Sequence, residues 1–128
     1  MRRSLVAGAP IRITEAMQSV MDGLVVDTVS PVAWPILHDA LDAGLAISDA
    51  AAVATLRDAG RGRHGDPPLE IGETGIAALA GAVVAASTAD LRRALGITAE
   101  SRLLAIACEG VTDRAVFAAL VDGAAVRA

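Results

Sequence analysis

The strongest constraint on the fold is the segment 72–86, whose pattern predicts a helix that is apolar around its whole circumference. Ile76, Leu79 and Val83 recur at helical spacing, and alanine or glycine fills almost every other position. Such a helix must be covered on several sides, because full burial of each large apolar side chain contributes about 1.5–3 kcal/mol. Gly81 costs about 1 kcal/mol relative to alanine within a helix, so we expect close backbone neighbours at that position.

A second apolar run, residues 102–113, follows a short break in the pattern. Charge precedes this run and a Glu-Gly turn follows its apolar part, which is typical of a fully buried parallel strand. Ligands of open α/β sheets bind outside the carboxyl ends of the strands. We therefore expect Cys108, Glu109 and Gly110 to lie at a binding site.

The rest of the chain predicts helices alternating with two to four short strands. The helices are expected over 14–22, 31–43, 50–59 and 87–95 and after Thr112 or Asp113, with a strand over 45–48. Alternation of strands and helices favours an α/β fold. We expect a weakly patterned segment over 1–13, one α/β domain over 14–122 and a frayed tail over 123–128, with neither an internal repeat nor a linker.

Composition excludes several classes of function. The net charge of −4, the isoelectric point near 5.0 and the 2 % aromatic content argue against nucleic acid and anionic membranes as partners. The mean hydropathy of +0.53 comes largely from alanine, and the uncharged run 74–89 is shorter than the roughly 20 apolar residues of a membrane span. A single cysteine and the lack of a recognisable signal peptide indicate a cytoplasmic chain.

Two sequence patterns that could carry chemistry do not point to a site. Residues 60–65, Gly-Arg-Gly-Arg-His-Gly, match the dinucleotide-binding pattern in letters. That pattern must follow a strand and open a helix, whereas this segment follows a predicted helix and precedes two prolines, so we interpret it as a basic loop. The spacing of the one cysteine and the two histidines predicts neither a metal site nor a catalytic group.

Four short motifs, taken together, resemble a known enzyme family. They are Val-Met-Asp-Gly-Leu at 20–24, Trp-Pro-Ile-Leu at 34–37, Gly-Glu-Thr-Gly at 72–75 and Cys-Glu-Gly-Val-Thr-Asp at 108–113, with Gly-Asp-Pro at 65–67 between them. In this order and spacing they are similar to the C-terminal part of diaminopropionate ammonia-lyases, which are pyridoxal-phosphate enzymes of the tryptophan-synthase-β-like class, fold type II. The resemblance covers about residues 15–118.

The resemblance implies an α/β fold: a partial three-layer parallel sheet with flanking helices, like the C-terminal part of the large domain. It also implies elimination of ammonia from 2,3-diaminopropionate to give pyruvate, with pyridoxal phosphate held as an imine on a lysine. Within this chain, Cys108 would face the pyridine nitrogen of the cofactor, Gly72 and Glu73 would approach the ring edge, and Gly110 would support the following turn. The same side chains also suit structural roles, with Cys108 as a small buried residue and Glu73 as a charge at a helix N-terminus.

The chain departs from the family in one decisive respect, because all eleven of its positive side chains are arginine. Without lysine it cannot form the imine and has no catalytic residue of its own. We therefore expect a fragment or split subunit that needs a complementing N-terminal chain or a full-length lyase. The alternatives are a non-catalytic module for binding or oligomerisation and, third, an enzyme of unrelated chemistry. Self-association is expected, because a truncated sheet exposes apolar surface.

Overall fold

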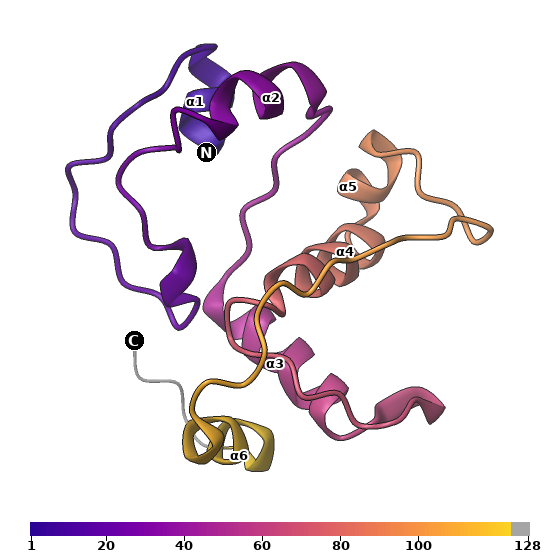
Figure 1. Ribbon diagram of the computed structural model, residues 1–128. Coiled ribbons are helices and arrows are strands. Elements are labelled where there is room, and N and C mark those ends of the chain that lie inside the picture. The colour runs from indigo at the N-terminus through magenta and orange to yellow at the C-terminus, as the bar shows by residue number, and fades with distance from the viewer. Residues whose placement is uncertain (124–128) are drawn as a thin grey trace.

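The protein is a set of helices joined by long irregular segments (Figure 1). The computed structural model describes residues 1–123. Its elements are α1 (Arg2–Ala7), η1 (Asp22–Leu24), α2 (Ala33–Ala40), α3 (Asp49–Gly60), η2 (Arg63–Gly65), α4 (Ala77–Ser87), α5 (Ala89–Ala94) and α6 (Arg114–Asp122). These 123 residues contain no β-strand, so the predicted α/β fold with a partial three-layer parallel sheet is wrong.

A small apolar core holds α3, α4 and α6 together. Val53 and Leu56, which the sequence predicts to point inward from the third helix, are 2 % and 1 % exposed. Ile76 is fully buried in the turn before α4, and Leu120 joins the core from α6. The remaining core residues are Met21 and Ala52.

The helix predicted over 72–86 begins later than expected and is covered on fewer sides. Residues 73–76 form a turn, and α4 runs over Ala77–Ser87 with Val83 46 % exposed. A Cβ atom at Gly81 would meet only the Leu45 Cδ2 atom, at 3.8 Å. The expectation of close backbone neighbours at Gly81 is therefore wrong, and the close approaches occur instead at the glycines of the preceding turn.

The polar cap predicted for the last helix agrees with the structure, whereas α3 is capped by Ser48, one residue before Asp49, where the sequence predicts the cap. The Ser48 hydroxyl accepts a hydrogen bond from the Ala51 N–H at the start of α3. Of the two expected caps of the last helix, Asp113 is the one used: its Oδ1 atom accepts from two backbone N–H groups of α6 at 2.9 and 3.0 Å. Pro35 lies in the first turn of α2, as expected, where its missing N–H costs nothing.

The predicted strands over 45–48 and 102–108 are irregular segments, and so is most of the helix predicted over 14–22. A continuous apolar run indicates a strand only if neighbouring strands satisfy its backbone on both sides. Here the run 102–108 passes along the outside of the molecule, and Leu104 and Ile106 are 90 % and 71 % exposed. The pattern of apolar residues is thus typical of a buried element, but residues 1–123 contain no neighbouring strand that would bury it.

The molecule is open rather than tightly closed. Its accessible surface is 8585 Å², whereas a compact monomer of the same mass exposes about 6300 Å². Figure 1 shows the reason: the part that carries α1 and α2 stands away from α3, α4 and α6, and long connections run between the two. None of the helices in residues 1–123 combines the length and the apolar character needed to cross a membrane.

Candidate functional site

Two glycines of the turn before α4 pack directly against the segment that follows Cys108. The Gly72 N–H donates a hydrogen bond of 3.1 Å to the Glu109 carbonyl oxygen. A Cβ atom at Gly72 would overlap the Gly110 carbonyl oxygen, and one at Gly75 would overlap the Glu109 carbonyl oxygen. Only glycine permits this approach of two backbones. The third and fourth of the four motifs, the Gly-Glu-Thr-Gly turn at 72–75 and the Cys-Glu-Gly segment at 108–110, therefore lie in contact.

A third segment reaches the same place from the N-terminal part of the chain. The Gly23 N–H donates a 3.1 Å hydrogen bond to the Thr74 hydroxyl oxygen, across 51 residues of sequence. A Cβ atom at Gly23 would lie 2.9 Å from the Thr74 Cγ2 atom, so glycine is needed here as well. We call this meeting point of Gly23, Gly72, Thr74, Gly75 and Glu109 the motif junction.

Glu109 links the junction to the turn that leads into α4. Its carboxylate Oε1 atom accepts from the Thr74 N–H at 3.4 Å, while its carbonyl oxygen accepts from Gly72. The turn continues into the helix through the Ile76 N–H, which donates to the Gly72 carbonyl oxygen at 3.0 Å. A carboxylate beside the N-terminal turn of a helix is favourable, because the helix dipole is positive there. The junction therefore holds the start of α4 in place.

An ion pair between Arg114 and Glu70 lies beside the junction. Both guanidinium nitrogens of Arg114, at the start of α6, donate to the two carboxylate oxygens of Glu70 at 3.1 and 3.2 Å. This bidentate geometry fixes the chain before Gly72 to the chain after Gly110. Because both side chains are more than half exposed, the pair orients these segments more than it stabilises them.

The four residues expected to contact pyridoxal phosphate do not form a cavity for it in this chain. Gly72 and Gly110 are in contact with each other, so there is no room for a cofactor ring between them. Cys108 is exposed with a free thiol, and Glu73 is half-buried in the turn. Neither of the two cavities described below is lined by any of the four. The residues present therefore do not fit the cofactor without a further chain. The alternative role of Cys108 as a small buried residue is also wrong.

The larger cavity is an open apolar groove of about 1020 Å³ beside the junction. It lies between one face of α4 and three irregular parts of the chain, and we call it the apolar groove. None of its lining residues is charged. They belong to segments 16–25, 43–47, 77–85 and 95–104.

A smaller cavity of about 230 Å³ lies on the other side of α4, between α3 and the loop that contains η2. Asp58 and Arg63, at its wall, form an ion pair of 3.2 Å. Gly62 has the left-handed φ of +62°, and its Cβ atom would lie 2.9 Å from the Pro68 Cδ atom. The loop predicted over 60–65 is thus confirmed as a turn after a helix, and it closes one end of this cavity.

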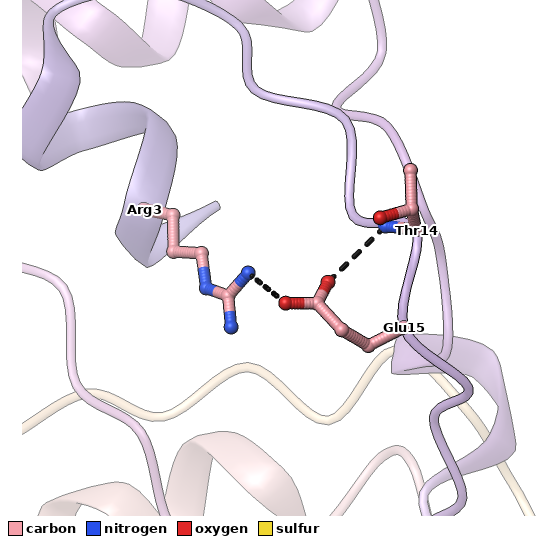
Figure 2. Close-up of polar contacts among 3 residues, drawn as sticks. All are labelled: Arg3, Thr14 and Glu15. Carbon is pink, nitrogen blue, oxygen red and sulfur yellow. Dashed lines mark hydrogen bonds and ion pairs between the residues drawn. The ribbon is translucent and has the colours of Figure 1, made fainter.

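The N-terminal part carries two surface ion pairs that shift carboxyl pKa values. Figure 2 shows the Arg3 guanidinium pointing at Glu15, with an Nη1–Oε1 distance of 2.9 Å, and the Thr14 N–H donating to the other oxygen at 3.2 Å. The hydrogen bond from Arg3 is the main reason that the pKa of Glu15 is lowered. In the same way, the hydrogen bond from Arg12 lowers the pKa of Asp27.

Sequence reasoning missed Gly23, Thr74 and Gly75 as members of the site. Two glycines three residues apart, outside a helix, are a signal for close backbone approach that could have indicated Gly72 and Gly75. No pattern in the sequence links Gly23 to Thr74, because their contact depends on the path of the whole N-terminal part. Within residues 1–123, no group of three or more His, Cys, Asp or Glu side chains is placed to hold a metal ion.

Comparisons with protein-family models, with curated proteins and with solved structures gave no significant match to this chain.

Proposed function

We propose that the chain is the C-terminal part or a split subunit of a pyridoxal-phosphate-dependent lyase similar to diaminopropionate ammonia-lyases. A second chain, which carries the lysine that these 128 residues lack, would complete it. The observation that supports the proposal is the motif junction. Three of the four motifs on which the resemblance rests are far apart in sequence, yet they meet in space through Gly23, Thr74 and Glu109.

The residues present indicate which parts of the completed site each of the two chains would supply. The complementing chain would supply the lysine and the phosphate-binding loop, because this chain has no lysine and its predicted cofactor residues form no cavity. This chain would supply the turn 72–75 and the segment 108–110 as one wall of the completed site. Cys108 is exposed at that wall and is free to face an added ligand. A cytoplasmic location belongs to the same proposal and is supported by the single, unpaired cysteine.

Complementation in trans tests the proposal. A full-length diaminopropionate ammonia-lyase is truncated before the region that resembles residues 15–118 and is mixed with this chain, pyridoxal phosphate and 2,3-diaminopropionate, and pyruvate is measured. We expect pyruvate formation above that of the truncated lyase alone, and co-elution of the two chains. The Gly75→Ala variant, which disturbs the junction, should complement less well. A folded chain, as judged by far-UV circular dichroism, that neither binds the truncated lyase nor restores pyruvate formation would contradict the proposal.

The alternative is a non-catalytic module for binding or oligomerisation, and a separate observation favours it. The accessible surface exceeds that of a compact monomer by about 2300 Å². Surface of this extent suits a chain whose role is to associate. The two functions differ in the complementation assay: a module would form complexes without restoring pyruvate formation.

A further inference from the structure

The smaller cavity, between α3, α4 and the loop 61–69, combines charged groups with an apolar floor. Leu69, Leu79 and Val83 contribute to this floor, and Leu69 and Val83 remain 42 % and 46 % exposed. The volume of about 230 Å³ is below the range of about 300–1,000 Å³ usual for pockets that take drug-sized molecules, so the cavity suits a smaller ligand. An apolar lining with a few placed polar groups is typical of small-molecule sites.

Arg63 supplies the positive charge of this cavity. Its Nε atom lies 3.2 Å from the Asp58 Oδ1 atom, so Asp58 orients the guanidinium group. The two terminal nitrogens, Nη1 and Nη2, have no hydrogen-bond or ion-pair partner among the groups that the structure describes. Two guanidinium N–H groups side by side bind a carboxylate in a bidentate manner. The cavity therefore offers a position for the carboxylate of a ligand.

Asp66, three residues further along the loop, supplies a negative charge to the same cavity. Its carboxylate likewise has no partner among the described side chains, whereas Asp58 is paired with Arg63. An unpaired carboxylate attracts an ammonium group, and charges of both signs favour a ligand that carries both. The guanidinium group, the carboxylate and the apolar floor together match the three parts of an aliphatic α-amino acid.

The backbone restricts the shape of the loop that carries both charges. Gly62 has a φ of +62°, and a Cβ atom there would lie 2.5 Å from the Asp66 carbonyl oxygen, so the turn is tightly closed. Two prolines follow Asp66 directly and fix φ at their positions. The Leu69 N–H donates at 2.9 Å to the Ala59 carbonyl oxygen and joins the end of the loop to α3. A loop that is ordered beforehand loses less conformational entropy when a ligand binds.

We propose that this cavity binds a small aliphatic α-amino acid, with the ligand carboxylate on Arg63, the ligand ammonium group on Asp66 and the ligand side chain on the apolar floor. Because the Arg63 side chain is 54 % exposed, water screens its charge. The affinity is therefore modest, with a dissociation constant of about 0.1–1 mM. This inference concerns a site on the other side of α4 from the apolar groove, and it does not depend on the lyase proposal.

Titration of the isotope-labelled full chain with L-valine, followed by heteronuclear NMR, tests the site. We expect the amide signals of Gly62 and Gly65 to shift to saturation and the Leu103 amide, at the apolar groove, to stay in place. Arg63→Gln removes the guanidinium group. Arg93→Gln is the matched control, because Arg93 is 78 % exposed on α5 and does not line the cavity. Both arginines are more than half exposed, so both variants should keep the fold, which far-UV circular dichroism checks.

We expect Arg63→Gln and Asp66→Asn each to raise the dissociation constant for L-valine about tenfold or more, and Arg93→Gln to leave it unchanged. Isobutylamine, which is valine without its carboxylate, and isovalerate, which is valine without its ammonium group, should each bind about tenfold more weakly than valine.

The proposal would be overturned if about 10 mM L-valine caused no shift of the Gly62 and Gly65 amides. Equal dissociation constants for Arg63→Gln and Arg93→Gln would also overturn it. So would binding of isobutylamine or isovalerate as tight as that of valine, or shifts confined to the apolar groove.

Discussion

Replacement of Gly75 by alanine is the most direct perturbation of the motif junction. The new Cβ atom would overlap the Glu109 carbonyl oxygen and would lie 3.1 Å from the Glu109 nitrogen and 3.1 Å from the Ile71 Cγ2 atom. Two of these three neighbours are backbone atoms, which cannot rotate away as a side chain does. The segment that contains Glu109 would have to move as a unit.

Three terms determine how much Gly75→Ala changes the free energy of unfolding. Overpacking of a close-packed site costs about 1–3 kcal/mol. Movement of Glu109 also weakens its hydrogen bond with the Gly72 N–H, which contributes about 0.5–1.5 kcal/mol. Against these, alanine restricts the unfolded chain and stabilises the fold by about 0.4–1 kcal/mol. We therefore expect Gly75→Ala to lower the free energy of unfolding by about 0.5–4 kcal/mol, with a central value of about 2 kcal/mol.

Gly110→Ala is the matched control, at the residue that directly follows Glu109 of the junction. A Cβ atom there meets no atom within 4 Å, and the residue does not have a positive φ. Only the unfolded-state term remains, so the free energy of unfolding should stay equal or rise by up to about 1 kcal/mol.

Urea unfolding, followed by far-UV circular dichroism and by Trp34 fluorescence, measures both variants. With a slope of about 2 kcal/mol per M, a loss of 2 kcal/mol lowers the midpoint by about 1 M. All samples need one protein concentration, because the midpoint of any self-associating chain depends on concentration. Equal midpoints for Gly75→Ala and Gly110→Ala would refute the close packing of the two backbones.

Three further predictions concern the core, a helix cap and acid stability. Ile76→Ala should cost about 2–5 kcal/mol because Ile76 is fully buried, while Val83→Ala, at a side chain 46 % exposed, should cost less than half as much in the same urea assay. Asp113→Ala removes the acceptor of two N–H groups of α6 and should cost about 1 kcal/mol, whereas Asp113→Asn should retain most of the stability. Hydrogen bonds from Arg3 and Arg12 lower the pKa values of Glu15 and Asp27, so the contribution of these carboxylates to stability is complete above the ordinary carboxyl range and is lost as the pH falls through the lowered values. The double variant Glu15→Gln, Asp27→Asn should therefore lose less stability than wild type on acidification, and an unchanged acid limb of the stability profile would exclude a role for these pairs.

The elements that sequence reasoning predicted well are those specified by local chemistry. Asp113 caps α6 as expected, and Ser48 caps α3 one residue before the expected Asp49, so both helices appear at nearly the expected positions. Val53 and Leu56 follow the 3.6-residue period and are buried. Such signals act within a few residues, so they need no knowledge of the rest of the fold.

The strand predictions were wrong because the stability of a strand depends on neighbouring strands elsewhere in the chain. The run 102–108 is apolar enough for a buried strand, but nothing in its own residues states whether a neighbouring strand exists. Cys108 was placed at the end of that strand, and it is exposed because the segment lies on the surface.

The candidate site was likewise predicted only where local sequence specifies it. The turn 72–75 and the segment 108–110 could be singled out from the sequence, and they do meet. The way they meet, through glycine backbones in contact, and the arrival of Gly23 beside Thr74 depend on tertiary structure.

The 51-residue separation between Gly23 and Thr74 has a consequence for the order of folding. Closing a loop of that size costs more chain entropy than pairing α3 with α4, which are joined by the 16 residues 61–76. We expect α3 and α4 to pair first and the hydrogen bond from Gly23 to form late. In native-state hydrogen exchange, the Gly23 amide should therefore open at lower free energy than the amides of α3. The N-terminal part would then detach as a unit while the helical core remains folded.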